Sequence, residues 1–164
     1  MATQGDAWAH YSLGFMYEDG QGVVQDLKEA VRLYRLAADQ GNALAQFTLG
    51  FMYQNGQGVP KDAKETVRLY GLAATQGNAS AQISLGNMYQ YGQAVVQDHK
   101  EAVKWYQLAA DQGDAYAQNN LGTMYNNGHG VAQDSKEAVK WYRLASAQGN
   151  ERAQCPASKP LIRN

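Results

Sequence analysis

The chain has 164 residues, an ordinary apolar content and a formal net charge of −1. The near-neutral charge argues against nucleic-acid binding, and no apolar run is long enough to insert into a membrane. The first residues lack the basic and apolar segments of a signal peptide, and the single cysteine, Cys155, excludes an intrachain disulfide framework and a cysteine-based zinc cluster. We therefore expect a cytoplasmic protein that carries no metal or other cofactor.

The sequence repeats with a period of 36 residues, most visibly at Gly5, Gly41, Gly77, Gly113 and Gly149. A fixed period in this range is typical of stacked-repeat proteins. The period predicts a single repeat domain over residues 1–164, with units at 5–40, 41–76, 77–112 and 113–148. We interpret residues 149–164 as the degenerate start of a fifth repeat and a tail, since Pro156 and Pro160 cannot continue a helix interior.

Each unit contains two predicted helices joined by a glycine-rich loop. The first helix follows an N-cap residue and runs to about a tyrosine; in chain order these pairs are Asp6 and Tyr17, Asn42 and Tyr53, Asn78 and Tyr89, and Asp114 and Tyr125. The second helix opens on an Asp-x-x-Glu sequence that favours a capping box, as in Asp26 and Glu29, and stops at the next Gln-Gly. Such short helices are marginal alone in water, so we expect neighbouring units to stabilise one another.

The motif from Ala45 through Leu49-Gly50, Met52-Tyr53, the loop at Gly56 and Gly58, and Tyr70 to Gly77 resembles the Sel-1-like repeat, a relative of the tetratricopeptide repeat. The resemblance covers residues 5–149. It implies an all-α fold, an α/α right-handed superhelical solenoid of helix–turn–helix repeats. It also implies an adaptor role, often in bacterial signalling, host interaction or membrane-protein quality control. One departure is Ala94, which replaces the second loop glycine in the third unit and predicts a strained or reshaped loop.

Differences among the units distinguish packing positions from positions that are free for binding. Ala9, Leu13, Met16 and Tyr17 share one arc of the first helix and barely change between units, so we assign this arc to the core. The glycine beside it, Gly14, is expected to let two helices approach closely. The opposite arc varies, and by resemblance to tetratricopeptide arrays it lines a concave groove. We call its candidate partner-binding residues the variable face: Trp8, Tyr11, Phe15, Leu44, Phe47, Phe51, Ile83, Asn87, Tyr91, Tyr116, Asn119, Thr123 and Asn127.

The variable face is aromatic and apolar in units one and two and rich in amides in units three and four. That division favours a peptide or partner helix with one apolar and one polar end. The face carries no lysine or arginine, so it does not predict a carboxylate clamp for a peptide C-terminus. An alternative for Trp8, Tyr11 and Phe15 is packing against a preceding helix.

The second helices present a basic stripe that offers a different binding surface, for an acidic or phosphorylated partner. The stripe comprises Lys28, Arg32, Arg35, Lys64, Arg68, Lys100, Lys104, Lys136, Lys140 and Arg143. Pairing with the glutamate three residues earlier explains the same arrangement without a ligand.

No catalytic residue is predicted. His10, His99 and His129 occupy three different repeat positions and show no metal-ligand spacing, and no phosphate-binding glycine motif occurs. We therefore predict a protein-interaction scaffold that binds a protein or peptide in the concave groove, and not an enzyme. The alternatives are the basic stripe or a purely structural segment of a longer array, and we also expect weak self-association through exposed array ends.

Overall fold

The computed structural model describes residues 4–148, and within this range it contains helices and no strand. The helices are Gln4–Asp19 (α1), Leu27–Asp39 (α2), Ala43–Asn55 (α3), Ala63–Thr75 (α4), Ala79–Tyr91 (α5), His99–Asp111 (α6), Ala115–Asn127 (α7) and Ser135–Ala147 (α8). Consecutive pairs, α1 with α2 through α7 with α8, form units one to four. The predicted fifth-repeat start and tail at residues 149–164, with Cys155, lie outside the described residues.

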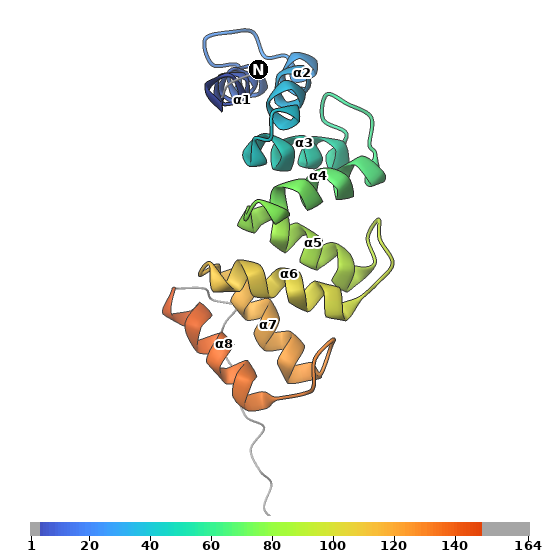
Figure 1. Ribbon diagram of the computed structural model, residues 1–164, viewed down its shortest axis with the longest axis vertical. Coiled ribbons are helices and arrows are strands. Elements are labelled where there is room, and N and C mark those ends of the chain that lie inside the picture. Colours follow the sequence, from blue (N-terminus) through green and yellow to red (C-terminus); the bar gives the residue numbers. More distant parts are fainter. Residues whose placement is uncertain (1–3, 149–164) are drawn as a thin grey trace, which may run out of the picture.

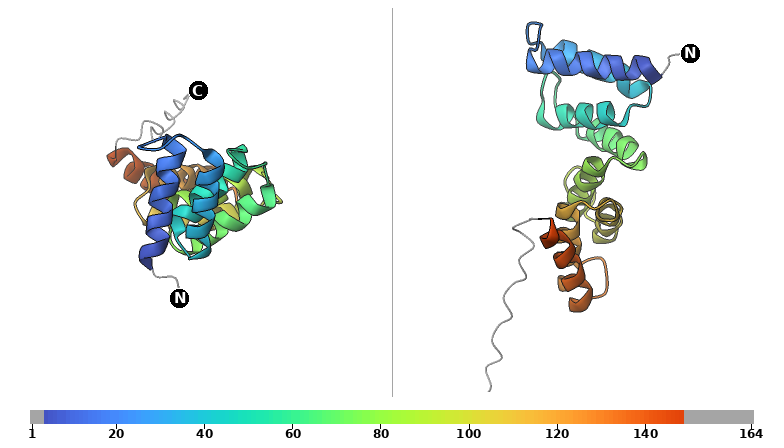
Figure 2. Two further views of the ribbon diagram at one scale, coloured as in Figure 1. Left: turned by 90° about the horizontal axis from the view of Figure 1, so that it is seen from above. Right: turned by 90° about the vertical axis from the view of Figure 1, so that its left-hand side faces the viewer.

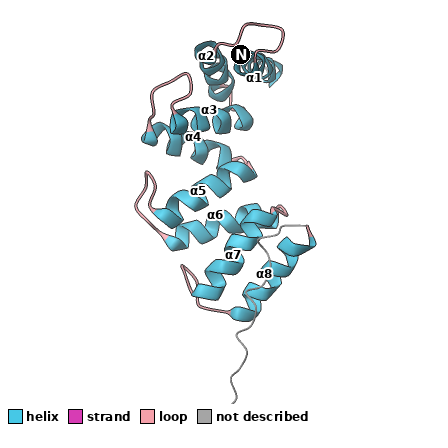
Figure 3. Ribbon diagram, turned by 180° about the vertical axis from the view of Figure 1, so that it is seen from behind, coloured by secondary structure: helices cyan, strands magenta, loops and turns pink. Residues whose placement is uncertain are grey.

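The helices stack in sequence order along the long axis of the molecule, from α1 at one end to α8 at the other (Figure 1). Viewed along this axis, they are rotated relative to one another (Figure 2). The longer loops lie within the units, between the first and second helix of each pair (Figure 3). The all-α solenoid predicted from the 36-residue period is confirmed.

The predicted caps determine where most helices begin and end. The Asp26 carboxylate accepts hydrogen bonds from the backbone N–H groups of Lys28 and Glu29, and Asp62, Asp98 and Asp134 likewise cap the other second helices. The other half of the predicted capping box, in which the Glu29 side chain would accept from the Asp26 N–H, does not form. The Asp26 N–H donates to the Tyr17 carbonyl, so Glu29 is free to pair with Arg32.

The first helices also differ from the prediction at one point. Asn42, Asn78 and Asp114 cap α3, α5 and α7 as expected. Asp6 does not begin α1, because this helix starts at Gln4 and Asp6 lies in its first turn.

Each unit is held together by a close approach of its two helices. A Cβ added at Gly50 would lie 2.8 Å from the Tyr70 ring, and one at Gly86 would lie 2.5 Å from the Tyr106 ring. Gly14 and Gly122 face Tyr34 and Tyr142 in the same way. The glycine of the Leu-Gly pair therefore seats a buried tyrosine, which confirms the expected close approach.

Successive units are joined by the alanine, leucine and methionine of the first helix. Ala45, Leu49 and Met52 of α3 are buried in one cluster with Ala30, Val31, Tyr34, Ala37 and Ala38 of α2. The corresponding residues of α5 and α7 are also buried.

In α1 the assignment of the same positions to the core was wrong. Ala9, Leu13 and Met16 are exposed, because among the described residues no preceding second helix covers them. The conserved arc, which comprises Ala9, Leu13, Met16 and their equivalents in the other units, is therefore an interface between units rather than a core within each unit.

The loop of the third unit keeps the positive φ of the other loops, so Ala94 is strained as predicted and the loop is not reshaped there. Ala94 has φ +62°, and within residues 4–148 it is the sole non-glycine residue with a positive φ. The equivalent Gly58 and Gly130 lie so close to the preceding second helix that a Cβ would collide with the backbone of Leu27 or His99. Ala94 lines a cavity of about 230 Å³ that Ala63 and Thr66 of α4 also line.

Candidate functional site

The variable face divides into two stripes that differ in burial. The inner stripe, formed by Tyr11, Phe47, Ile83 and Asn119, is half-buried. The Tyr11 ring lies 5.5 Å from the ring of Tyr34, which is on the second helix of the same unit. The inner stripe therefore contributes to the packing within units.

Phe47 illustrates the consequence for the predicted site. We expected Phe47 and Phe51, both on the variable face, to be free for binding, but only Phe51 is exposed. The Phe47 ring stacks on Tyr70 with centroids 5.5 Å apart and an interplanar angle of 26°. That expectation was wrong for Phe47, because the ring covers a tyrosine that is otherwise buried between the two helices.

The outer stripe carries the exposed apolar side chains of the variable face. These are Trp8, Phe15, Leu44, Phe51 and Tyr91, of which all but Tyr91 belong to units one and two. Trp8 is 56% exposed and Phe51 is 44% exposed. Of the remaining predicted residues, Asn87, Tyr116 and Thr123 are half-buried and Asn127 is exposed.

The hydroxyl groups of the buried tyrosines explain why the outer stripe differs between units. In units three and four, the residue at the Phe51 position has a polar contact with the tyrosine hydroxyl. The Tyr106 hydroxyl lies 2.6 Å from both Asn87 Oδ1 and Gln90 Oε1, and Thr123 Oγ1 lies 3.2 Å from the Tyr142 hydroxyl.

In units one and two the tyrosine hydroxyl is satisfied three residues further along the first helix. Tyr34 donates to Glu18, and Tyr70 donates to Gln54 Oε1 at 2.8 Å. Burial raises the pKa of Tyr70 to about 12. Phe15 and Phe51 are thus left without a polar role in their units and remain exposed.

A cavity of about 600 Å³ lies between the starts of α1 and α3, next to the outer stripe. Trp8 and Leu44 line it together with the side chains of Gln40 and Gln76. A hollow lined by an indole and a leucine can hold an apolar side chain.

The basic stripe is partly neutralised by its own helices, through one cation in each unit. Arg32 pairs with Glu29 and Arg68 with Glu65, each at 2.6 Å, and Lys104 and Lys140 pair with Glu101 and Glu137. The hydrogen bond from Arg32 lowers the pKa of Glu29. The i,i+3 pairing predicted for this stripe is confirmed.

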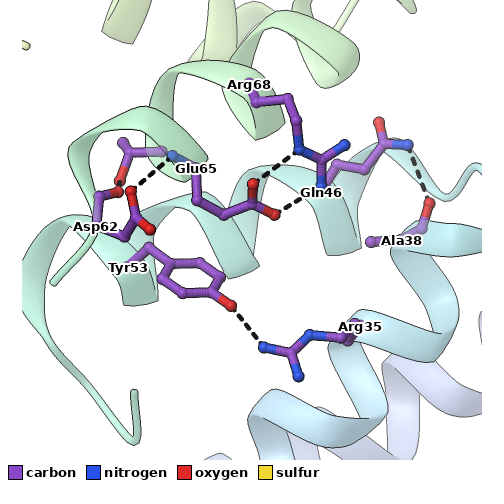
Figure 4. A network of polar contacts seen from close by, with 8 residues as sticks. Arg35, Ala38, Gln46, Tyr53, Asp62, Glu65 and Arg68 are labelled. Atoms are coloured by element: carbon purple, nitrogen blue, oxygen red, sulfur yellow. Dashed lines mark hydrogen bonds and ion pairs between the residues drawn. The ribbon is translucent and has the colours of Figure 1, made fainter. Parts of the chain in front are cut away.

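One polar feature was missed in the sequence. The buried Gln46 donates from Nε2 to the Ala38 carbonyl of the preceding unit at 3.1 Å, and its Oε1 accepts from Gln76 Nε2 at 2.7 Å. The same ladder recurs at Gln82 and Gln118 (Figure 4 shows the Gln46 contact). The signal was present in the sequence, because glutamine recurs at the repeat position of Gln46 and at that of Gln76.

The structure brings two of the histidines together. The rings of His99 and His129 stack with centroids 5.0 Å apart, and His10 Nδ1 lies 3.1 Å from Gln40 Nε2. Over residues 4–148 no group of three or more histidine, cysteine or acidic side chains is arranged to hold a metal ion. Within the same residues, no helix combines the length and hydropathy needed to cross a bilayer.

Comparison with known proteins agrees with this architecture. The Sel1 repeat model matches residues 9–42, 43–78, 79–114 and 115–150. No curated protein gives a significant match.

Several solved structures are similar to the chain. A Sel1 repeat protein from Oxalobacter formigenes is 40% identical, with a TM-score of 0.84 over 90% of this chain and 60% of its own. The protective antigen c5321 of uropathogenic Escherichia coli, which has an SLR fold, is 42% identical, with a TM-score of 0.87 over 92% of this chain and 32% of its own. Helicobacter pylori cysteine rich protein B is 25% identical, with a TM-score of 0.60 over 80% of this chain and 96% of its own.

This chain spans less than two thirds of the length of the first two of these structures. The four consecutive family matches cover nearly all of the chain, and the structural neighbours share its stacked helix pairs. The chain therefore belongs to the Sel1 repeat family, whose members generally act as non-catalytic scaffolds in protein–protein interactions.

Proposed function

We propose that this chain is an interaction scaffold that binds a peptide or partner helix on the outer stripe of units one and two. The observation that carries the proposal is the exposure of Trp8, Phe15, Leu44 and Phe51 beside the cavity between α1 and α3. Large aromatic side chains bring much contact area with few rotamers to freeze, so they are frequent hot spots of binding.

The chemistry of the face indicates the kind of partner. An apolar anchor of the partner would enter the cavity against Trp8 and Leu44. Further along the array, the face offers the exposed Asn127, which suits a polar segment. The partner would therefore be amphipathic along its length, with its apolar end on units one and two.

The basic stripe is the alternative surface, but its cations are less available than the sequence alone indicated. One cation in each unit already pairs with a glutamate. Binding through the stripe would weaken steeply with added salt, whereas binding through the outer stripe would change little. The cytoplasmic setting expected from the sequence stays a prediction.

The test compares two substitutions at similarly exposed apolar positions on different faces. Phe51→Ala removes an outer-stripe aromatic, and Leu72→Ala removes a 41%-exposed leucine from the second helix α4. Proteins captured from a native extract by the parent chain are identified by mass spectrometry, and each is titrated against both variants at two salt concentrations. We expect Phe51→Ala to weaken binding at least about tenfold, a loss typical of a hot spot.

Leu72→Ala should bind like the parent, and neither variant should melt much earlier than the parent. Equal binding by parent and Phe51→Ala would reject the outer stripe. If salt alone abolished that binding, the basic stripe would replace it as the partner surface.

A further inference from the structure

The two ends of the described array present the two halves of the interface that joins its units. The first half is the upstream face of α1, formed by Ala9, Leu13 and Met16. Leu13 is 39% exposed, whereas the equivalent Leu49 is 2% exposed because α2 covers it. Among residues 4–148, α1 has no helix in the place that α2 occupies beside α3.

The second half is the downstream face of α8. Ser146 is exposed, although its equivalents Ala38, Ala74 and Ala110 on the other second helices are buried under the next first helix. The nearby Arg143 is also exposed. Within the described residues, nothing therefore packs on this face of α8 as α3 packs on α2.

Two hydrogen bonds inside the array show which polar groups pair where a second helix packs on the first helix of the next unit. The Arg35 guanidinium of α2 donates to the Tyr53 hydroxyl of α3 at 2.5 Å, and Gln46 donates to the Ala38 carbonyl at 3.1 Å (Figure 4). Both contacts run between consecutive units, from one second helix to the next first helix.

The end faces hold the counterparts of these groups. Arg143 stands at the Arg35 position and Tyr17 at the Tyr53 position, so the same hydrogen bond can form between two copies. His10 stands at the Gln46 position, with its Nδ1 3.1 Å from Gln40 Nε2. When Nδ1 accepts from Gln40, the ring proton is on Nε2, which can donate to the Ser146 carbonyl of a second copy.

We propose that the upstream face of α1 docks α8 of a second copy of this chain, in the arrangement that α2 and α3 adopt inside the array. The second copy is favoured as the occupant because α8 carries the small residue, the arginine and the carbonyl that the internal interface uses. The surface is separate from the outer stripe, so the proposal stands or falls independently of the proposed function.

The geometry determines the kind of assembly. The two faces differ, so the contact is heterologous, and each added copy leaves one free α1 face and one free α8 face. Since consecutive units are rotated about the long axis, repeated docking continues the solenoid instead of closing a dimer. Ser146 and His10 replace residues that are Ala and Gln inside the array, which makes this contact weaker than an internal one.

The test uses one blocking substitution at each end of the chain. Leu13→Glu places a charge on the α1 face, and Ser146→Arg places a bulky side chain where small residues pack inside the array. Both side chains are exposed, so we expect both variants to fold and to melt only slightly earlier than the parent. Met16→Lys is a second block of the α1 face if Leu13→Glu unfolds.

Sedimentation velocity over a concentration series gives the readout. We expect the average mass of the parent to rise past that of a dimer without a plateau, and each blocked variant to remain monomeric. An equimolar mixture of the two variants should form a 1:1 dimer and nothing larger, because one intact face remains on each. Phe51→Ala, on the outer stripe, should assemble like the parent.

Three results would overturn the proposal. The parent could remain monomeric at every concentration. Ser146→Arg could form dimers by itself, which would indicate pairing of two α1 faces. The mixture of the two variants could stay monomeric while the parent assembles, which would place the contact elsewhere on the chain.

Discussion

Gln46 on α3 donates a 3.1 Å hydrogen bond to the carbonyl of Ala38 on α2, across the boundary between units one and two. Its amide oxygen accepts from Gln76, which ends the second helix of its own unit. A buried side chain thus satisfies a carbonyl at the C-terminal end of one helix and fixes the position of the next unit. Gln82 and Gln118 repeat the contact at the following boundaries.

Gln82→Ala should therefore loosen the coupling between units two and three. The change leaves the Ala74 carbonyl and the Gln112 amide without the partners they have at 3.1 and 2.8 Å. We expect a loss of about 1–3 kcal/mol in the free energy of unfolding and a broader urea transition, because coupling between repeats sustains the cooperativity. Gln107→Ala is the control, since Gln107 bonds only to Asp111 on the surface of α6; an equal loss in both variants would contradict the coupling role.

Gly86→Ala should destabilise the protein, and Gly71→Ala should stabilise it. The added methyl group at Gly86 would lie 2.5 Å from the Tyr106 ring, whereas at Gly71 on α4 nothing lies within 4 Å. We expect Gly86→Ala to cost about 1–3 kcal/mol through overpacking and Gly71→Ala to add about 0.5–1 kcal/mol through helix propensity. Chemical denaturation measures both; a harmless Gly86→Ala would mean that the tyrosine can move aside.

Leu85→Ala and Leu13→Ala test the interpretation of the conserved arc as an interface between units. Both leucines occupy the same repeat position, but Leu85 is buried by the preceding unit and Leu13 is exposed. We expect a loss of about 2–5 kcal/mol for Leu85→Ala and about 1 kcal/mol for Leu13→Ala, measured on dilute protein. Equal losses would indicate that Leu13 belongs to the core of its own unit.

The buried tyrosines predict a loss of stability at high pH. Burial raises the pKa of Tyr34, Tyr70 and Tyr106 above 10.0, the usual value of a tyrosine. Above pH 10 the unfolded chain then releases protons that the folded chain keeps, so the free energy of unfolding falls as the pH rises toward the folded-state values. Urea titrations from pH 8 to 12 measure the decline, and the part of the phenolate absorbance that comes from the buried tyrosines should appear only with unfolding.

Tyr70→Phe is the control for this titration. It should show a shallower decline above pH 10, after an initial cost of about 0.5–1.5 kcal/mol from the lost hydrogen bond to Gln54. An unchanged slope in this variant would show that Tyr70 does not contribute to the alkaline transition.

The sequence by itself determined the architecture and most helix ends. The 36-residue period fixed the units, and the capping residues work locally: the Asp62 carboxylate accepts from the Glu65 N–H of its own helix, and Gly56 takes the left-handed conformation at the end of α3. These features depend on residues within a few positions of each other, so a pattern of residue types is enough to predict them. The strained Ala94 was predictable for the same reason.

Only the tertiary structure decided which side chains remain exposed, because burial depends on a neighbour far away in the sequence. Leu13 and Leu49 are the same residue in the same local pattern, yet within residues 4–148 a preceding helix covers Leu49 and none covers Leu13. Phe47 and Phe51 lie on one helix, yet Phe47 alone meets a tyrosine of the opposite helix. Repeat periodicity gives a residue's place within its unit, while its exposure is decided by the helices that pack on that unit.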